Sequence, residues 1–379
     1  MGVRLSGVKV ILCDLCALCV SVVKSSSLHR TLAALVILLG TLLPAAAQQV
    51  TVKFAYSPSA PIGTYIAATG TDAFTREGIR LDTQRFSEPA ASLDAISSRH
   101  VQFGGVGLAG ALQAISLGQP LKMISAFEYT FTDKSGHPWE AVFVIARRDA
   151  RIASVKDLKG RKVAILGVSS TWYLALRDRL REAGVDTRDV TFLSMPYTQM
   201  AGALTLGQVD VAIITSTEYV RVGQRLPVDV VMTGSQLTGL KLDLTQAIVA
   251  RADWLQENQA VAVGFLRAML RTRAFMRQDI ADNGGATIKR FIREQLKFDD
   301  FLTDTFYGYR AGYAGRELEF VNDLDVPRPV IEVYGRTLEG AGLLRGAKPA
   351  TFEQVVDLSY LKRAYAELGL RWDDAKVPD

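Results

Sequence analysis

Three hydroxyl side chains stand in a row where a predicted strand gives way to a predicted helix. The apolar segment Lys162–Leu166 ends at Gly167, and Ser169, Ser170 and Thr171 then open an amphipathic helix. The first turn of a helix carries backbone N–H groups without intrahelical partners and about half a positive charge, which suits an anionic or carbonyl-bearing ligand. No base accompanies the hydroxyls, so the pattern predicts binding and not catalysis. Ordinary helix capping explains the same residues, and the surrounding elements must decide between the two.

The side chains that commonly carry catalysis are scarce in this sequence. All three cysteines, Cys13, Cys16 and Cys19, lie near the N-terminus. His100 and His137 are isolated and do not form a metal-binding spacing such as His-x-x-x-His. Neither the Gly-x-Ser-x-Gly nucleophile motif nor the phosphate loop Gly-x-x-x-x-Gly-Lys-Ser/Thr is present. We therefore expect no enzyme activity, no catalytic residue, no metal site and no cofactor.

The N-terminal segment is typical of a cleavable secretory signal peptide. Arg30 is followed by the apolar run Thr31–Leu43, and three alanines ending at Ala47 follow soon after. A membrane anchor would need a longer apolar run of about 18 or more residues. The residues before Cys16 and Cys19 lack the pattern of a lipidated cysteine. We expect residues 1–47 to be removed after Ala47 and the mature chain to be periplasmic, without a lipid anchor.

The overall charge is small. Removing residues 1–47 takes away four basic residues and one acidic residue, so the 44 basic and 39 acidic residues become 40 and 38. Binding to nucleic acid would call for a concentrated basic face, which this sequence does not predict. With 49% hydrophobic and 22% charged residues, the chain has a globular composition and the length for two domains.

After the leader, strand-like and helix-like segments alternate. We predict strands at Val50–Tyr56, Leu81–Phe86, Val101–Gly104, Leu121–Phe127, Trp139–Ala146, Lys162–Leu166, Val190–Leu193, Val211–Thr215, Val228–Met232 and Thr245–Ala250. The alternation predicts an α/β fold with parallel strands and helices on both faces of the sheet. Mostly helical sequence follows from Asp253 onward.

The alternation of strand-like and helix-like segments starts again after a polar insert at residues 130–138, and this second series predicts two α/β lobes. Lobe 1 would comprise residues 48–147 and 241–379, and lobe 2 residues 148–240. The chain would cross between them twice, near Val144–Arg151 and near Thr233–Gln246. Ligands of open α/β sheets bind beyond the carboxyl ends of the strands, so each lobe would present its strand-end loops to a shared cleft.

Six segments, in this order, resemble the substrate-binding proteins of nitrate/sulfonate/taurine-type ABC importers, a family that includes binding proteins for thiamine pyrimidine precursors. The segments are Tyr56–Pro58, Phe74–Phe86, Val101–Ile124, Ser154–Ile165, Ala203–Ile214 and Phe352–Leu370. The resemblance implies a bilobal periplasmic-binding-protein type II fold, with two doubly wound α/β lobes joined by a two-crossing hinge. Trp172 stands where the family often has a histidine or similar polar residue, and its indole favours a ligand with an apolar or aromatic body.

Ligand contacts are expected from the strand ends of both lobes. The candidates are Ser57, Pro58, Ser59, Gly105, Val106, Gly107 and Tyr129 in lobe 1, and Ser169, Ser170, Thr171, Trp172, Tyr197, Thr215, Thr217 and Glu218 in lobe 2. Tight-turn geometry explains the glycines equally well, and packing explains Tyr129. Glu218 either receives an ammonium or ring N–H of the ligand or lies in the first turn of a helix, where acids are favoured. We favour the helix-turn interpretation of Glu218.

The resemblance implies a periplasmic solute receptor of an ABC importer. Such a receptor closes around a small anionic or heteroaromatic solute, for example a sulfonate, taurine, nitrate or a pyrimidine, and delivers it to an inner-membrane permease by transient docking. We expect a monomer that binds no nucleic acid. Two alternatives stay open: an enzyme on the same scaffold, similar to the pyrimidine synthases of thiamine biosynthesis, and a ligand-sensing partner of a membrane receptor. The lack of cysteine in the mature chain argues against the enzyme.

Overall fold

The computed structural model describes residues 49–56, 70–86, 89–132, 138–240, 242–297, 299–300, 303 and 323–373. Gln49–Asp379 form one compact unit. The predicted signal peptide, residues 1–47, lies outside the described residues. None of the helices in the described ranges is both long and apolar enough to cross a membrane.

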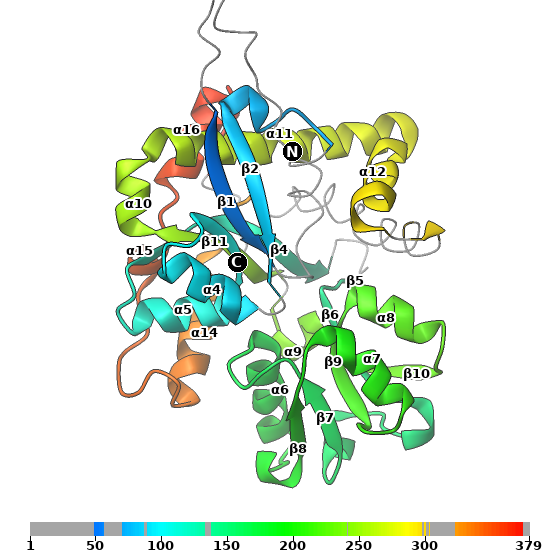
Figure 1. Cartoon of the computed structure of the whole chain (residues 1–379). Coiled ribbons are helices and arrows are strands. Elements are labelled where there is room, and N and C mark those ends of the chain that lie inside the picture. Colours follow the sequence, from blue (N-terminus) through cyan, green and yellow to red (C-terminus); the bar gives the residue numbers. More distant parts are fainter. Residues whose placement is uncertain are drawn as a thin grey trace, which may run out of the picture. The chain divides into compact units, whose positions relative to one another are not determined.

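Six strands form the first sheet, in the order β2-β1-β3-β11-β4-β5 (Figure 1). Their bounds are β1 Val50–Tyr56, β2 Ile79–Arg85, β3 Phe103–Gly107, β4 Leu121–Thr132, β5 Pro138–Trp139 and β11 Leu242–Arg251. β1 pairs in parallel with β2 and β3, whereas β11 runs antiparallel to both β3 and β4. The parallel pairing predicted from the sequence is therefore wrong for β4 and β11, because these strands carry the chain toward and back from the second sheet.

Five strands form the second sheet, in the order β10-β6-β9-β7-β8. Their bounds are β6 Val142–Arg147, β7 Lys162–Ile165, β8 Thr191–Ser194, β9 Val211–Thr215 and β10 Val228–Thr233. β7 pairs in parallel with β8 and β9, whereas β6 is antiparallel to β9 and β10, so the predicted parallel pairing is also wrong for β6 and β10. The predicted single strand Trp139–Ala146 is thus two strands of different sheets, linked by residues 140–141. No turn residue separates them in the sequence, so only the pairing reveals the break.

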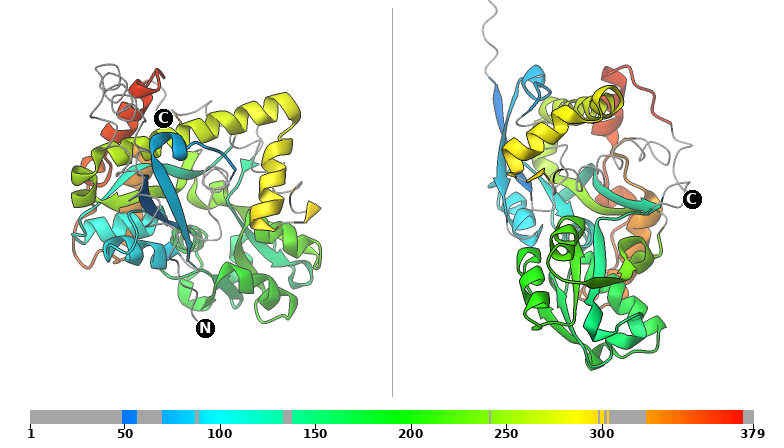
Figure 2. Two further views of the ribbon diagram at one scale, coloured as in Figure 1. Left: turned by 45° about the horizontal axis from the view of Figure 1, so that its top comes forward. Right: turned by 90° about the vertical axis from the view of Figure 1, so that its right-hand side faces the viewer.

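Helices cover both faces of each sheet, as predicted (Figures 1 and 2). The α-helices in the described residues are α4 Pro89–Ser97, α5 Leu108–Ser116, α6 Thr171–Glu182, α7 Tyr197–Thr205, α8 Ser216–Gly223, α9 Gly234–Thr238, α10 Ala252–Glu257, α11 Gln259–Asn283, α12 Ala286–Phe291, α14 Arg328–Gly340, α15 Phe352–Val355 and α16 Ser359–Glu367. In the first sheet, α5 and α14 share one hydrophobic core and α11 and α16 share the other. In the second sheet, α6 and α9 pack on one face and α7 and α8 on the opposite face.

The long helix α11 is held to the first sheet by an aromatic stack. Phe265 on α11 is fully buried, and its ring stacks on Phe103 of β3 at 4.4 Å and on Phe54 of β1 at 5.7 Å between centroids. Buried aromatic pairs stabilise a core beyond the area that they bury. This stack fixes β1 and β3, and the last residues of β3 line the site described below.

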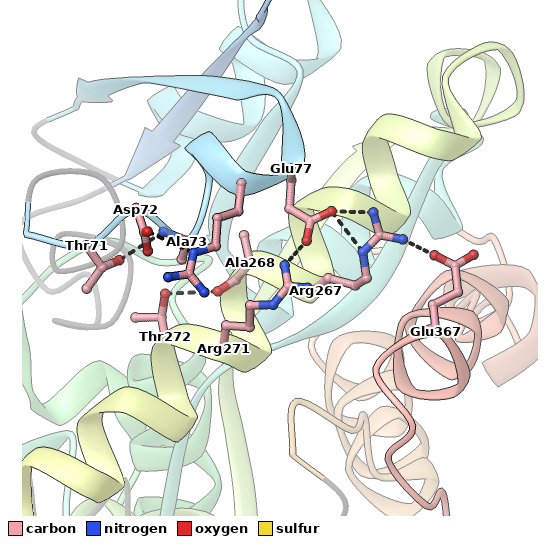
Figure 3. A network of polar contacts seen from close by, with 10 residues as sticks. Thr71, Asp72, Ala73, Glu77, Arg267, Ala268, Arg271, Thr272 and Glu367 are labelled. Carbon is pink, nitrogen blue, oxygen red and sulfur yellow. Dashed lines mark hydrogen bonds and ion pairs between the residues drawn. The ribbon is translucent and has the colours of Figure 1, made fainter. Parts of the chain in front are cut away.

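A network of ion pairs ties the outer face of α11 to two other segments (Figure 3). The Glu77 carboxylate, in the short 3-10 turn Thr75–Glu77, accepts hydrogen bonds from Arg267 and Arg271 on α11. Arg267 also donates to Glu367 at the end of α16. Glu77 is nearly buried, with a side chain 3% exposed, whereas the side chain of Glu367 is 32% exposed. The buried member of the network is therefore the one on which stability depends most.

Candidate functional site

A cavity of about 330 Å³ is lined by residues that belong to, or directly follow, strands of both sheets. The strands β3, β7, β8 and β9 lead into it, and the helices that follow them, α5, α6, α7 and α8, begin at its wall. This arrangement matches the rule that ligands of α/β sheets bind beyond the carboxyl ends of the strands. The volume lies within the range of small-molecule sites, about 300 to 1,000 Å³.

The hydroxyl cluster singled out in the sequence lies in this wall. Ser169, Ser170 and Thr171 all line the cavity. Ser170 is also the N-cap of α6, since its hydroxyl accepts a hydrogen bond from the Tyr173 N–H at 3.2 Å. The Thr171 hydroxyl accepts from the N–H of Ala109 at 3.4 Å, which joins the start of α6 to the start of α5. Capping and cavity lining therefore coexist at this helix start.

Trp172 contributes both to the cavity and to the core of the second sheet. Its side chain lines the cavity but is only 7% exposed. The indole packs with the hydrophobic core of β6, β7 and α6 and lies against Gly234, the first residue of α9. Trp172 therefore presents a limited apolar surface to a ligand and is mainly a packing residue.

Tyr197 and Thr215 line the cavity from two further helix starts. Burial, with the negative charge of Glu128 as a smaller cause, raises the pKa of the Tyr197 hydroxyl above its ordinary value, so it is a neutral hydrogen-bonding group. The Thr215 hydroxyl accepts from the N–H of Glu218 at 3.4 Å and caps α8. Both residues offer hydroxyl groups rather than charge to a bound solute.

The cavity wall also holds a polar group that the sequence pattern does not single out: Glu128 on β4, with Thr245 and Gln246 on β11. All three are buried, and Glu128 is 3% exposed. One carboxylate oxygen of Glu128, Oε2, accepts from the Thr245 hydroxyl at 3.0 Å and from Gln246 Nε2 at 2.9 Å. The signal in the sequence is a glutamate inside the apolar strand 121–132, because acidic residues are rarely buried unless partnered.

Several sequence candidates are not among the described residues that line the cavity. Ser57, Pro58 and Ser59 lie outside the described residues, and the structure describes no side-chain surroundings for Thr217. Val106 and Gly107 line the cavity, whereas a Cβ on Gly105 would collide with the Phe127 ring, so that glycine permits close packing. Tyr129 is buried in the core, and its hydroxyl donates to the Asp325 carbonyl.

Glu218 likewise is absent from the described lining of the cavity. Its carboxylate pairs with Arg221 at 2.9 Å in the first turn of α8, which fits the interpretation that we favoured from the sequence. Burial raises the pKa of the Glu218 carboxyl, and the charge of Arg221 opposes that effect.

The described lining residues provide hydrogen-bonding groups and apolar surface. They include hydroxyls, amides and the side chains of Leu93, Val142 and Leu166, and among them no cysteine or histidine occurs. Across the described ranges, no cluster of three or more His, Cys, Asp or Glu residues could hold a metal ion. The arrangement is suited to holding a solute of moderate size.

Comparison with known proteins identifies the family. The family model described as NMT1/THI5 like matches residues 60–280. The riboflavin-binding protein RibY of Chloroflexus aurantiacus is 26% identical over 230 residues, a match that covers 59% of this chain and 61% of the relative.

Solved structures share the fold over most of the chain. The aliphatic sulphonate-binding protein SsuA of Escherichia coli superposes with a TM-score of 0.63 at 17% identity, covering 81% of this chain and 92% of that one. The nitrate-binding protein NrtA of Synechocystis PCC 6803 gives 0.66 at 13% identity, covering 88% and 92%. The desulfurization enzyme DSZB also shares the fold, with a TM-score of 0.62 at 12% identity, covering 84% and 100%. The bilobal periplasmic-binding-protein fold predicted from the sequence is thereby confirmed.

Proposed function

We propose that this chain, which belongs to the NMT1/THI5-like family, is the solute receptor of an ABC importer. The observation that carries the proposal is the cavity lined by residues of both sheets, at which four helices begin. Backbone N–H groups at these helix starts and the hydroxyls beside them can hold polar atoms of a solute. No cysteine or histidine occurs among the described residues of the wall, and the proposed receptor binds and releases its solute unchanged.

The proposed mechanism is hinge closure between two lobes. Because β6 pairs within the second sheet, we place the first crossing at residues 140–141, earlier than the sequence suggests, and the second at 234–241. Lobe 1 then holds residues 48–139 and 242–379, and lobe 2 the part between the crossings. A solute that contacts both lobes favours the closed state, because those contacts exist together only there.

The ligand proposed for this cavity is a heteroaromatic solute. A cavity of about 330 Å³ is roughly the volume of ten water molecules in the liquid, so a nitrate ion would leave most of it to water. The surfaces of Trp172, Leu93 and Val142 suit a flat apolar body. The curated relative is named for binding riboflavin, a solute of this class.

The partner and location follow from this role. The proposed receptor is exported by the signal peptide, acts as a monomer in the periplasm and docks transiently on an inner-membrane permease. SsuA and NrtA are named as periplasmic binding proteins, which supports this location.

A solute screen tests the proposal. The purified mature chain is heated with riboflavin, uracil, a thiamine pyrimidine precursor, taurine, hexanesulfonate or nitrate, and any shift is followed by calorimetric titration. A solute at 100 times its Kd should stabilise the native state by about 2.7 kcal/mol and raise the Tm. Mass spectrometry of the recovered solute separates receptor from enzyme, since a chemical change in the solute would favour an enzyme like DSZB.

A further inference from the structure

We propose that the solute is an elongated molecule whose chain lies in a trough between α4 and α5, and that Gly110 is the specificity-determining residue of this trough. The inference rests on the proposed receptor function and narrows its ligand class. The site would take a polar head group, such as a heteroaromatic ring, that carries a chain, and would select it over the bare head group.

The cavity extends from the strand ends along one face of α5. The lining residues of this helix and its two ends, spaced by about one helical turn, are Gly107, Gly110, Gln113, Ala114 and Leu117. Gly107 lies opposite Gln246 of β11, which also lines the cavity, so this end of the face is at the sheet. At a rise of 1.5 Å per residue, Leu117 lies about 15 Å further along the helix. The cavity is therefore longer than a nitrate ion or a single pyrimidine ring.

A second side of the trough is formed by α4, which packs beside α5 (Figure 1). Its lining residues, again on one face, are Ala90, Leu93 and Asp94. At the far end of the trough, the Ser97 hydroxyl of α4 donates to Gln119 Oε1, just beyond α5, at 2.7 Å. The opposite faces of both helices, with Ile96 and Leu112, are buried in one hydrophobic core. The fold itself therefore holds the trough in shape, which lowers the entropic cost of binding a chain there.

Gly110 leaves space in the middle of the trough. Its backbone has no positive φ, so the helix does not require a glycine there. Among the described residues, a Cβ on Gly110 would meet nothing within 4 Å outside its own helix. Since Gly110 lines the cavity, the space beside it belongs to the cavity, and a larger side chain would project into that space. A chain lying along α5 would pass over this residue.

The two ends of the cavity suit different parts of such a solute. The Ala109 N–H donates to the Thr171 hydroxyl at 3.4 Å, so the starts of α5 and α6 meet at the inner end. Backbone N–H groups at these helix starts can hold polar atoms of a head group. Further along the trough, Leu93 and Ala114 offer apolar surface, and Leu117 is 40% exposed. The chain would therefore run from the helix starts toward solvent.

Three pairs of solutes that differ in length test the inference by calorimetric titration. They are riboflavin and lumichrome, which lacks the sugar-alcohol chain, uridine and uracil, and hexanesulfonate and methanesulfonate. In each pair that binds, the longer member should bind at least tenfold more tightly, a gain that corresponds to burying about two methylene groups. Gly110→Leu, whose side chain would occupy the trough, should weaken binding of the longer member at least tenfold and leave that of the shorter member nearly unchanged.

The matched control is Gly202→Leu in α7. Gly202 is also a helical glycine whose Cβ would meet nothing within 4 Å among the described residues, but it is not part of the described lining of the cavity. This variant should leave every affinity unchanged. Because leucine favours a helix more than glycine does, neither substitution should lower the free energy of unfolding in urea.

Two results would overturn the inference and leave the receptor function standing. One is equal or tighter binding of the shorter member in a pair that binds the wild-type chain. The other is undiminished binding of the longer member by Gly110→Leu. If none of the six solutes binds the wild-type chain, the receptor proposal fails as well.

Discussion

Replacing Asp243 with asparagine should remove a large part of the pH dependence of folding stability. Asp243 lies on β11 just after the proposed second crossing, is fully buried, and accepts a hydrogen bond from the Tyr334 hydroxyl at 2.9 Å. Burial raises the pKa of its carboxyl to about 7, helped by the nearby charge of Glu140 and opposed by the Tyr334 hydrogen bond. The native state therefore holds a proton on Asp243 at a pH where the unfolded chain has lost it.

The sign and size of the pH effect on the free energy of unfolding follow from this difference in pKa between the folded and unfolded states. The unfolded side chain titrates near 3.8 and the folded one near 7, at about 1.4 kcal/mol for each pH unit between them. The free energy of unfolding should therefore fall by about 4 kcal/mol as the pH rises from about 4 to 7, and then level off. Glu140, whose pKa burial also raises, adds a contribution of the same sign.

Urea unfolding of the wild type and of Asp243→Asn between pH 4 and 8 measures the effect. Asparagine keeps an oxygen that can accept from Tyr334 but cannot ionise, so the variant should gain up to about 4 kcal/mol relative to the wild type across this range. Tyr334→Phe, which removes the hydroxyl that favours the charged form, should shift the wild-type fall to higher pH. Parallel stability curves for the wild type and Asp243→Asn would refute the reasoning.

Three further predictions, on ion pairing, packing and capping, are tested by urea unfolding. Glu77→Gln should lower the free energy of unfolding by about 2 kcal/mol, less than the loss of a fully buried ion pair, because the arginines that pair with Glu77 are partly exposed. Glu367→Gln should lower it by less than about 1 kcal/mol, because this carboxylate is more exposed. Equal losses for the two variants would contradict the role given to burial. Gly234→Ala should cost about 1 to 3 kcal/mol because its Cβ would lie 2.8 Å from Glu140 Oε2, and the control Gly223→Ala, which meets nothing within 4 Å, should not destabilise. Ser170→Ala should cost about 1 kcal/mol through the lost cap of α6, and an unchanged stability would show that the cap is not needed.

Local patterns predict most of the strands and helices because each has its own periodicity and end signals. The strand over Val50–Tyr56 and the helix after Ser170 are examples, and the structure has both. Sheet membership is different, because the apolar run before Arg147 contains no turn residue to mark where the chain leaves the first sheet. That break depends on the partners of β6, which are distant in the sequence.

The residues of the cavity wall likewise divide into those that local sequence patterns predict and those that depend on distant pairing. Residues at helix starts, such as Ser169 and Tyr197, can be found from the sequence because a strand followed by a capped helix has a local signature. Glu128 and Gln246 lie inside strands, and they meet only through the antiparallel pairing of β4 with β11 and its bulge at Thr245. No local pattern contains that pairing, so the sequence can mark Glu128 as an unusual strand residue but cannot show its contact with Gln246.

A side chain of the cavity wall contacts the residues of the proposed crossings, and this contact provides a physical route by which a bound solute could influence closure. Trp172 lines the cavity and lies against Gly234 in the second crossing. Glu140, in the first crossing, accepts hydrogen bonds from the N–H and the hydroxyl of Ser235 at 2.9 and 2.6 Å. The two crossings are thereby tied together next to a residue that a solute would touch.

Ser235→Ala should therefore change the affinity for the solute, although Ser235 is not among the described residues that line the cavity. The variant removes one hydrogen bond to a buried carboxylate, a loss of about 1.5 to 3 kcal/mol in stability. If the Ser235–Glu140 hydrogen bond contributes a different free energy in the open and closed states, its removal shifts the equilibrium between them. The affinity for the solute then changes by a related amount, because solute binding is coupled to the same open–closed equilibrium. Urea unfolding measures the change in stability, and calorimetric titration measures the change in affinity. A lower stability with an unchanged affinity would show that Ser235 stabilises the fold only, and that its hydrogen bond to Glu140 is equally strong in the open and closed states.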